Sequence, residues 1–218
     1  MLLRTLLLVS TSIYSAYSCP PTPTARARAT IFRARMGAYP NESIGIIDIT
    51  QSGNQVRFRG TVFTLTPGYH GMHVHAIGDL GNGCLAAGPH FNPFGAPHGG
   101  LKGRRNDRHV GDLGNIFANV SLAVVTYYVS HDVGKISNLI SRGFFHLFVL
   151  SIQFQRNGEA MFDLRTTGAS ITRGPRDIIG RTIVIHSMQD DLGKENRGES
   201  ATTGNSGMRV ACGLILPR

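Results

Sequence analysis

The sequence predicts an all-β protein, a sandwich built from eight short strands. Segments rich in β-branched or alternating apolar and polar residues recur along the chain and are bounded by Gly, Pro, Asn and Asp. Helical periodicity is not convincing anywhere, which argues against a mixed fold. The expected strands are residues 29–36, 43–50, 55–65, 71–75, 112–118, 159–164, 182–186 and 208–214.

A long irregular loop is expected between the fourth and fifth strands. Residues 78–100 contain seven glycines and three prolines, a composition that neither a helix nor a central strand tolerates. His90 and His98 lie on this loop and His109 lies beside it. Loops of this length are usually functional or disordered. Because this loop carries candidate metal ligands at intervals, a bound metal ion would explain how it is ordered.

The number of candidate metal ligands suggests two ions. On a strand, His73 and His75 share a face and could hold one ion together. Seven donors are too many for a single four-coordinate site: His73, His75, His90, His98, His109, His186 and Asp112. One division gives three histidines and an aspartate, which suits zinc, and an all-imidazole set, which suits Cu(II). Two such sites would need one shared histidine, its ring deprotonated between two cations. Taken singly, each histidine is more often a polar residue of a core or turn.

Several motifs carry a resemblance to the copper/zinc superoxide dismutase family. They span residues 71–75 (Gly-Met-His-Val-His), 87–93 (Ala-Gly-Pro-His-Phe-Asn-Pro), 98–100 (His-Gly-Gly), 108–115 (Arg-His-Val-Gly-Asp-Leu-Gly-Asn), 180–186 (Gly-Arg-Thr-Ile-Val-Ile-His) and 203–213 (Thr-Gly-Asn-Ser-Gly-Met-Arg-Val-Ala-Cys-Gly). The resemblance runs from about residue 29 to residue 216, apart from one insertion. It implies an eight-stranded Greek-key barrel of the immunoglobulin-like sandwich type, with long metal-binding and electrostatic loops.

The same resemblance implies roles for individual residues. The copper ligands would be His73, His75, His90 and His186. The zinc ligands would be His90, His98, His109 and Asp112, so that His90 bridges the metals. Asp190 would join one copper histidine to one zinc histidine, Arg209 would hold the anionic substrate beside the copper, and His70 would be structural. Cys84 and Cys212 match the family's disulfide, and His131 and His146 fall in the insertion and receive no role.

The implied activity is dismutation of superoxide to oxygen and hydrogen peroxide, with Arg209 and His90 as catalytic residues. Glu199 matches a charged family position, but Thr202 replaces a lysine common in the family's guiding loop. Steering of the substrate would then rely on other basic residues, such as residues 102–105. Two alternatives are weaker: a copper-binding or chaperone-like relative without turnover would lack some of these residues, and a structural matrix protein would not need the copper set.

The N-terminus predicts export. Residues 1–18 have the form of a secretory signal, and their apolar run is too short to span a membrane. Removing them leaves 200 residues, enough for one domain, and Cys19 would become the first residue, either a free thiol or an intermolecular link. Residues 41–43 (Asn-Glu-Ser) offer a glycosylation site in an exported chain.

The partners expected from charge and resemblance are few. A net charge of +9 suggests weak binding to extracellular polyanions, although a solvated basic surface explains it about as well. No nucleic-acid motif accompanies the charge. The resemblance implies a homodimer.

Residues 120–153 depart from the family pattern. In relatives, the residues after the motif at 108–115 lead within a few positions into a tight turn, which here corresponds to residues 156–159 and is delayed by 34 residues. A loop elaboration would cost little, but the run at 144–152 is too apolar for an exposed arm. The codons for residues 120–121 can form a splice donor and those for 144–153 a splice acceptor. We interpret the segment as a translated, unspliced intron.

Overall fold

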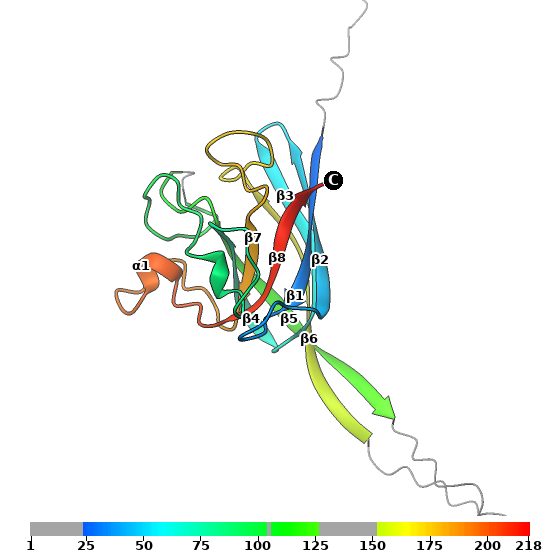
Figure 1. Ribbon diagram of the computed structural model, residues 1–218. Coiled ribbons are helices and arrows are strands. Elements are labelled where there is room, and N and C mark those ends of the chain that lie inside the picture. Colours follow the sequence, from blue (N-terminus) through cyan, green and yellow to red (C-terminus); the bar gives the residue numbers. More distant parts are fainter. Residues whose placement is uncertain (1–23, 104–105, 127–151) are drawn as a thin grey trace, which may run out of the picture.

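The computed structural model describes residues 24–103, 106–126 and 152–218. Its eight antiparallel strands close into a barrel with the order β1-β2-β3-β6-β5-β4-β7-β8 (Figure 1). The order departs from the sequence where β3 is followed by β6 and where β4 is followed by β7, so the connections are those of a Greek key. The predicted all-β Greek-key barrel is confirmed.

The strands lie where the sequence predicted them, with some differences in length. Their bounds are β1 (Ala25–Arg33), β2 (Ser43–Ser52), β3 (Gln55–Leu65), β4 (Gly68–His75), β5 (Asp112–Thr126), β6 (Ile152–Thr166), β7 (Thr182–His186) and β8 (Arg209–Pro217). Strand β1 begins earlier than predicted because Ala25 already pairs with Gln51 of β2 and Ala27 with Pro217 of β8. It also ends earlier, at Arg33. Two short helical turns were not predicted, η1 (Leu85–Ala87) and α1 (Ser200–Thr203).

Strands β5 and β6 are longer than predicted because they pair with each other beyond the barrel. Their register continues from Asn119 opposite Glu159 to Thr126 opposite Ile152, and Figure 1 shows this ribbon projecting from the barrel. The expectation of a turn at residues 156–159 is therefore wrong for this chain. Residues 156–159 of β6 pair with residues 119–122 of β5, so Asn157 lies in a strand opposite Ser121. The apolar run at 144–152 lies almost wholly outside the described residues.

Alternating side chains fill the barrel. In β2 and β3, inward residues such as Ile47, Ile49 and Phe58 are completely buried while their neighbours are at least partly exposed. Burial of each such side chain stabilises the fold by roughly 1.5–3 kcal/mol. All five residues of β7 are buried instead, because the loop around the disulfide packs over its outer side; Val184 clusters there with Cys84 and Cys212.

The disulfide implied by the resemblance is present. Cys84 on the long loop is bonded to Cys212 of β8, with an S–S distance of 2.10 Å. The long loop and the segment carrying α1 lie together on one side of the barrel, opposite β1, β2 and β3 (Figure 1). None of the described helices is long and apolar enough to cross a membrane.

Candidate metal centre

Strand pairing gathers the histidines at one end of β4. This strand lies between β5 and β7, so His73 is opposite both Asp112 and Val184. His75, two residues on, forms an isolated bridge with His90 of the long loop. Segments far apart in the sequence therefore meet at a single buried cluster, in which the histidines are at most 6% exposed.

Backbone carbonyl groups fix the orientation of two rings. Nδ1 of His75 lies 2.7 Å from the carbonyl oxygen of Gly88, and Nδ1 of His186 lies 3.1 Å from that of Gly207. In both rings Nδ1–H is then the donor and Nε2 keeps its lone pair. The two Nε2 atoms point toward each other, 3.4 Å apart.

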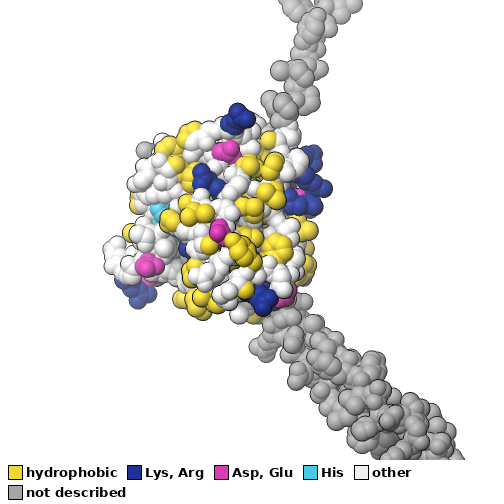
Figure 2. All heavy atoms as spheres, viewed as in Figure 1, with side chains coloured by type: hydrophobic (Ala, Val, Ile, Leu, Met, Phe, Trp, Pro, Cys, Tyr) yellow, Lys and Arg dark blue, Asp and Glu magenta, His cyan; other side chains and the backbone are white. Residues whose placement is uncertain are grey.

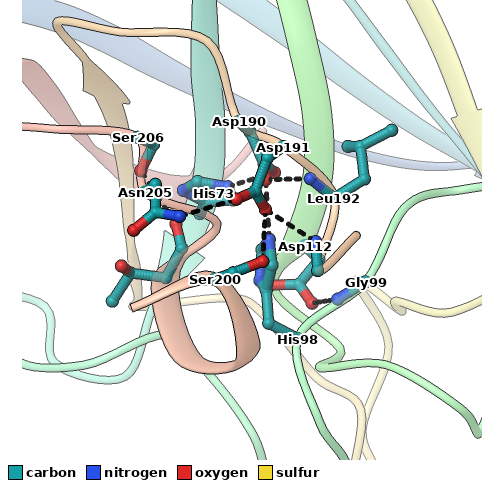
Figure 3. Close-up of polar contacts among 12 residues, drawn as sticks. His73, His98, Gly99, Asp112, Asp190, Asp191, Leu192, Ser200, Asn205 and Ser206 are labelled. Atoms are coloured by element: carbon teal, nitrogen blue, oxygen red, sulfur yellow. Dashed lines mark hydrogen bonds and ion pairs between the residues drawn. The ribbon is translucent and has the colours of Figure 1, made fainter. Parts of the chain in front are cut away.

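Asp190 joins two further rings, as Figure 3 shows. Its Oδ2 accepts a hydrogen bond from Nε2 of His73 at 3.0 Å, and its Oδ1 accepts one from Nε2 of His98 at 2.8 Å. Each ring therefore keeps its Nδ1 for another partner. Among the described residues, Nδ1 of His73 is buried and has no hydrogen-bond partner, whereas Nδ1 of His98 lies 3.0 Å from Oδ1 of Asp112. Because an orphaned buried nitrogen is costly, Nδ1 of His73 indicates that a ligand completes the site.

The third group lies around Asp112. Its Oδ1 is 3.0 Å from Nδ1 of His90, 3.0 Å from Nδ1 of His98 and 3.1 Å from Nδ1 of His109. Nδ1 of His90 is also 3.4 Å from that of His109. Nε2 of His90, on the other edge of the same ring, is buried and has no hydrogen-bond partner in the described chain.

Two groups of donors lie close enough to hold an ion each. Within each group the candidate ligand atoms are all within 4.8 Å of one another: His73, His75, His90 and His186 in the first, and His73, His90, His98 and Asp112 in the second. The first contains the four copper ligands that the resemblance implied. The second contains three of the four zinc ligands and has His73 in place of His109, although Nδ1 of His109 is 3.1 Å from Asp112.

Burial keeps most of these rings uncharged. Desolvation lowers the pKa of His90 to about 4 and that of His186 to about 3, so both are neutral at pH 7 with lone pairs available. Burial also lowers the pKa of His75 well below its usual range. At His98, burial is outweighed by hydrogen bonds to Asp112 and Asp190, which raise its pKa to about 9. At Asp190, burial is likewise outweighed by hydrogen bonds from His73 and His98, which hold the carboxyl pKa below its usual range.

Several residues without a predicted role hold the site in shape. The Asn115 side chain binds both the backbone N–H and the carbonyl oxygen of Asp190, at 2.8 Å each. Gly204 has a φ of +67°, and a side chain there would overlap Asp190 and His98. Arg108 is buried and donates to the backbone oxygen of Asp112 at 2.6 Å. Arg108 and Asn115 belong to the motif at 108–115, but nothing in the sequence assigned their contacts.

A pocket of about 720 Å³ opens over the first group of donors, and His75, His90 and His186 line it. Arg209 reaches into it from the start of β8, where it is paired with His186. Its guanidinium is fixed by three carbonyl oxygens: Cys84 at 2.7 Å, Leu85 at 3.2 Å and Gly88 at 2.6 Å. A cation held in place by these carbonyl groups therefore stands beside the candidate metal ligands.

A second arginine in this pocket had no predicted role. Arg181 donates from Nη1 to the oxygen of Ala76 at 2.6 Å, and its guanidinium lies 3.6 Å from the centre of the Phe91 ring. Glu199 and Thr202 also line the pocket, whereas Lys102 does not. Arg104 and Arg105, which were expected to help steer the substrate, lie outside the described residues.

The remaining predicted residues divide between structure and undescribed chain. His70 is buried, and its two ring nitrogens each lie 2.7 Å from a carbonyl oxygen, of His186 and of Thr66, so it braces the β4 end of the site. The predicted signal at residues 1–18, together with Cys19, His131 and His146, falls outside the described residues.

The fold and site together define a class of protein: a Greek-key barrel with two groups of buried donors, histidines and one aspartate, each of which could hold a metal ion. Comparison with known families agrees, since the family described as copper/zinc superoxide dismutase matches residues 43–144 and 149–215. The chain belongs to this family.

Individual relatives are similar over most of their length. The chain is 40% identical to an extracellular superoxide dismutase [Cu-Zn] of Haemonchus contortus over 190 residues, which cover 87% of this chain and 82% of the relative. It is 39% identical to the Caenorhabditis elegans protein of the same name, covering 87% and 68%. A third relative, superoxide dismutase [Cu-Zn] A of Xenopus laevis, is 40% identical, covering 76% and 83%.

Proposed function

We propose that this protein catalyses the dismutation of superoxide to oxygen and hydrogen peroxide, using one copper and one zinc ion. The observation that carries the proposal is the His90 ring. Its Nδ1 faces Asp112 and His109, and its Nε2 faces the copper group without a hydrogen-bond partner in the described chain. A neutral imidazole has one donor and one acceptor nitrogen, whereas a ring between two cations can use both as ligands.

The hydrogen bonds indicate which atom of each residue would be a ligand. The copper ligands would be Nδ1 of His73 and Nε2 of His75, His90 and His186. The zinc ligands would be Nδ1 of His90, His98 and His109 with Oδ1 of Asp112. We prefer His109 to His73 for zinc, because a single nitrogen of His73 remains after its bond to Asp190, and the copper group needs it.

The chemistry divides between the metals and the chain. Bound copper supplies and accepts the single electron, while zinc, which has no redox chemistry, orders the loop and the His90 ring. Arg209 holds each superoxide anion by charge-assisted hydrogen bonds, at a place fixed by its carbonyl partners. Nε2 of His90, once it no longer serves as a ligand, would take up a proton from solvent while the first superoxide leaves as oxygen. The ring then delivers that proton to the second superoxide, which gains an electron and a further proton from solvent and leaves as hydrogen peroxide.

Metal analysis combined with an activity assay tests this function. The purified chain, loaded with copper and zinc, should contain one of each and should consume superoxide faster than a His186→Ala variant loaded in the same way. A pure protein with both metals in place and no turnover would overturn the proposal. That result would favour the alternative, a copper-binding or chaperone-like protein with the same fold.

We also propose that the chain is secreted and that residues 1–18 are its signal. The extracellular names of the Haemonchus contortus and Caenorhabditis elegans relatives support export. N-terminal sequencing of the secreted protein tests it, with a first residue at or just after Cys19 expected. A homodimer and weak binding to extracellular polyanions are further parts of this proposal.

Residues 120–153 remain, in our proposal, a translated intron inside a single domain that spans residues 19–218. Support comes from the register at the end of the barrel: Asn119 is already opposite Glu159, so joining Asn119 to Phe154 would leave a loop of five residues, 154–158. Loops of that length commonly close hairpins. Sequencing the mature transcript tests the idea, and a major message that carries these 34 codons would contradict it.

A further inference from the structure

Arg108 is a buried cation whose hydrogen bonds all go to neutral groups. Only 3% of its surface is exposed. Its Nη1 donates to the backbone oxygens of His109 and Asp112, at 3.1 Å and 2.6 Å, and its Nη2 donates to Oγ1 of Thr166 at 2.8 Å. Nε is buried and has no acceptor in the described part of the chain. Because a buried charge is costly unless an opposite charge accompanies it, this guanidinium group needs a counter-ion.

No carboxylate of the described residues supplies that counter-ion, since Arg108 forms no ion pair with any of them. Asp112 offers it a backbone oxygen only, because both carboxylate oxygens are engaged elsewhere. Oδ1 faces three histidine rings, and Oδ2 accepts from the backbone N–H groups of Gly99 and His109. Within the described chain, the charge of Arg108 is therefore uncompensated.

Arg108 is part of the lining of a cleft of about 170 Å³ between the sheet and the segment that precedes β5. Val56 of β3 pairs with Thr166 of β6, and the residues next to this pair, Gln55 and Thr167, form one edge of the cleft. Arg108 is its buried part, and most of the other lining residues are exposed. None of the residues that line it is acidic: Gln55, Leu101, Gly103, Arg108, Arg165, Thr166 and Thr167.

Arg165, at the rim of this cleft, is a second arginine without an acid. Its side chain is exposed and forms no ion pair with a described residue. Arg57 stands opposite it on β3, but Arg57 is bound in a bidentate pair to Asp163. Two cations therefore border one small cleft whose lining has no carboxylate.

An exposed arginine alone does not define a site, because Lys and Arg side chains occur at several separate places on the face of the barrel shown in Figure 2. This cleft differs because one of its two cations is buried and held in one orientation by its hydrogen bonds. A Cβ at Gly168 would lie 2.5 Å from Nη2 of Arg108, so a glycine at this position leaves room for the guanidinium group. The cleft thus combines a fixed cation inside with an exposed cation at its mouth.

We propose that this cleft binds a small tetrahedral oxyanion, free inorganic phosphate. Guanidinium groups recognise such anions by charge-assisted hydrogen bonds, and two arginines together match the charge of a phosphate dianion. The hydroxyl group of Thr167 and the amide group of Gln55 are neutral donors at the rim. Because sites for drug-sized ligands measure about 300–1,000 Å³, the smaller cleft suits a free ion better than a phosphorylated cofactor.

A bound anion would also act on the zinc group. Arg108 holds the backbone oxygens of His109 and Asp112, so neutralising its charge would stabilise the segment that carries both candidate ligands. The melting temperature of the metal-loaded protein should therefore rise with phosphate concentration, because a ligand of the folded chain shifts the folding equilibrium. The cleft shares no lining residue with the pocket that contains Arg209, so the proposal is independent of the superoxide chemistry.

Calorimetric titration of the metal-loaded protein with inorganic phosphate tests the proposal. Arg165→Gln removes the cation at the rim, which has no ion pair to lose, and should weaken phosphate binding about 10- to 100-fold. The matched control Arg59→Gln removes an exposed arginine of β3 that also has no ion pair in the described chain and does not line the cleft. The control should change affinity by less than about twofold. Equal losses in both variants would mean that diffuse charge attracts the anion, and would overturn the site.

Thr167→Asp tests the need for a counter-ion directly, because its carboxylate would stand in the cleft permanently. We expect this variant to lose phosphate binding and to melt at a higher temperature than the parent in phosphate-free buffer. Thr167→Asn, which has a side chain of the same size without the charge, is the control. A Thr167→Asp protein that still binds phosphate as the parent does, or that is no more stable than Thr167→Asn, would contradict the proposal.

The copper pocket is the other place where phosphate could bind, because Arg209 lies there. Arg209→Gln should keep the phosphate site. Loss of binding in Arg209→Gln, with binding retained in Arg165→Gln, would place the anion in the copper pocket and overturn the proposal. Glycerol phosphate, a phosphomonoester, should bind more weakly than inorganic phosphate; tighter binding would mean that the ligand is a phosphorylated molecule. A parent protein without saturable phosphate binding would overturn the ligand class.

Discussion

Asp190 controls the metal centre without being a ligand in our assignment. One carboxylate fixes the rings of His73 and His98, so a single substitution should disturb both ions. In Asp190→Asn only one side-chain oxygen remains to accept, and one ring loses its partner. We expect metal affinity to fall about 10- to 100-fold, as measured by competition with chelators. Asp191→Asn is the matched control, because Asp191 binds Asn205 and Ser200 instead of histidines; similar losses in both variants would contradict this role.

Arg209 should depend on its shape as well as its charge. Arg209→Lys keeps the cation but cannot span the carbonyl groups of Cys84 and Gly88, which bind different nitrogens of the guanidinium. The kcat/KM for superoxide should fall roughly tenfold while copper and zinc contents stay at the parent level. Unchanged turnover at equal metal content would show that a mobile cation is sufficient.

At the scale of elements, the disulfide connects the long loop to β8 and therefore to Arg209. Cys84→Ser/Cys212→Ser releases a closure of 128 residues and should lower the free energy of unfolding by about 2–5 kcal/mol, measured by denaturant titration. The loop would also lose its anchor, so turnover should decrease more than metal content. Cys19→Ser, at a position outside the described residues, is the control, and a loss of stability there as large as in the double variant would count against this account.

The β5–β6 ribbon can be removed if the intron proposal is correct. A chain lacking residues 120–153 should fold, because the pair Asn119–Glu159 already lies at the end of the barrel. It should bind both metals and keep its turnover within about twofold, since the one metal ligand on these two strands, Asp112, lies at the opposite end of β5 from the deleted residues. Loss of folding on deletion, followed by circular dichroism, would mean that the segment belongs to the domain.

At the scale of the whole molecule, the apolar surface beside β8 is a candidate dimer interface. Ile77 and Leu216 are each about half exposed. Thr182 of β7 donates to the oxygen of Ile77 and pairs with Leu214 of β8, two residues before Leu216. Sedimentation should show a dimer for the parent and a monomer for Ile77→Glu, because a carboxylate cannot be buried there without a partner. Phe63→Glu, on the face of β3, is the control; a dimer that survives Ile77→Glu would place the interface elsewhere.

The fold was predictable because its signals are local. Alternation and turn residues gave the strands at residues 55–65 and 182–186 with the observed bounds. The ends of β5 and β6 were not predictable, since their extra residues are held by pairing with each other. The two short helices, such as α1, are held by loop contacts and have no periodicity to detect.

The sequence by itself determined the all-β class, the seven donors and, through the family's motifs, their division into two sites. Local residue chemistry is enough for this, because imidazoles at strand spacing and along a glycine-rich loop are suited to binding metal ions. Only the tertiary structure decided which nitrogen of each ring is free and how Arg181 and Arg108 contact the site. Those features depend on hydrogen bonds and strand register between segments distant in the chain, which no local pattern records.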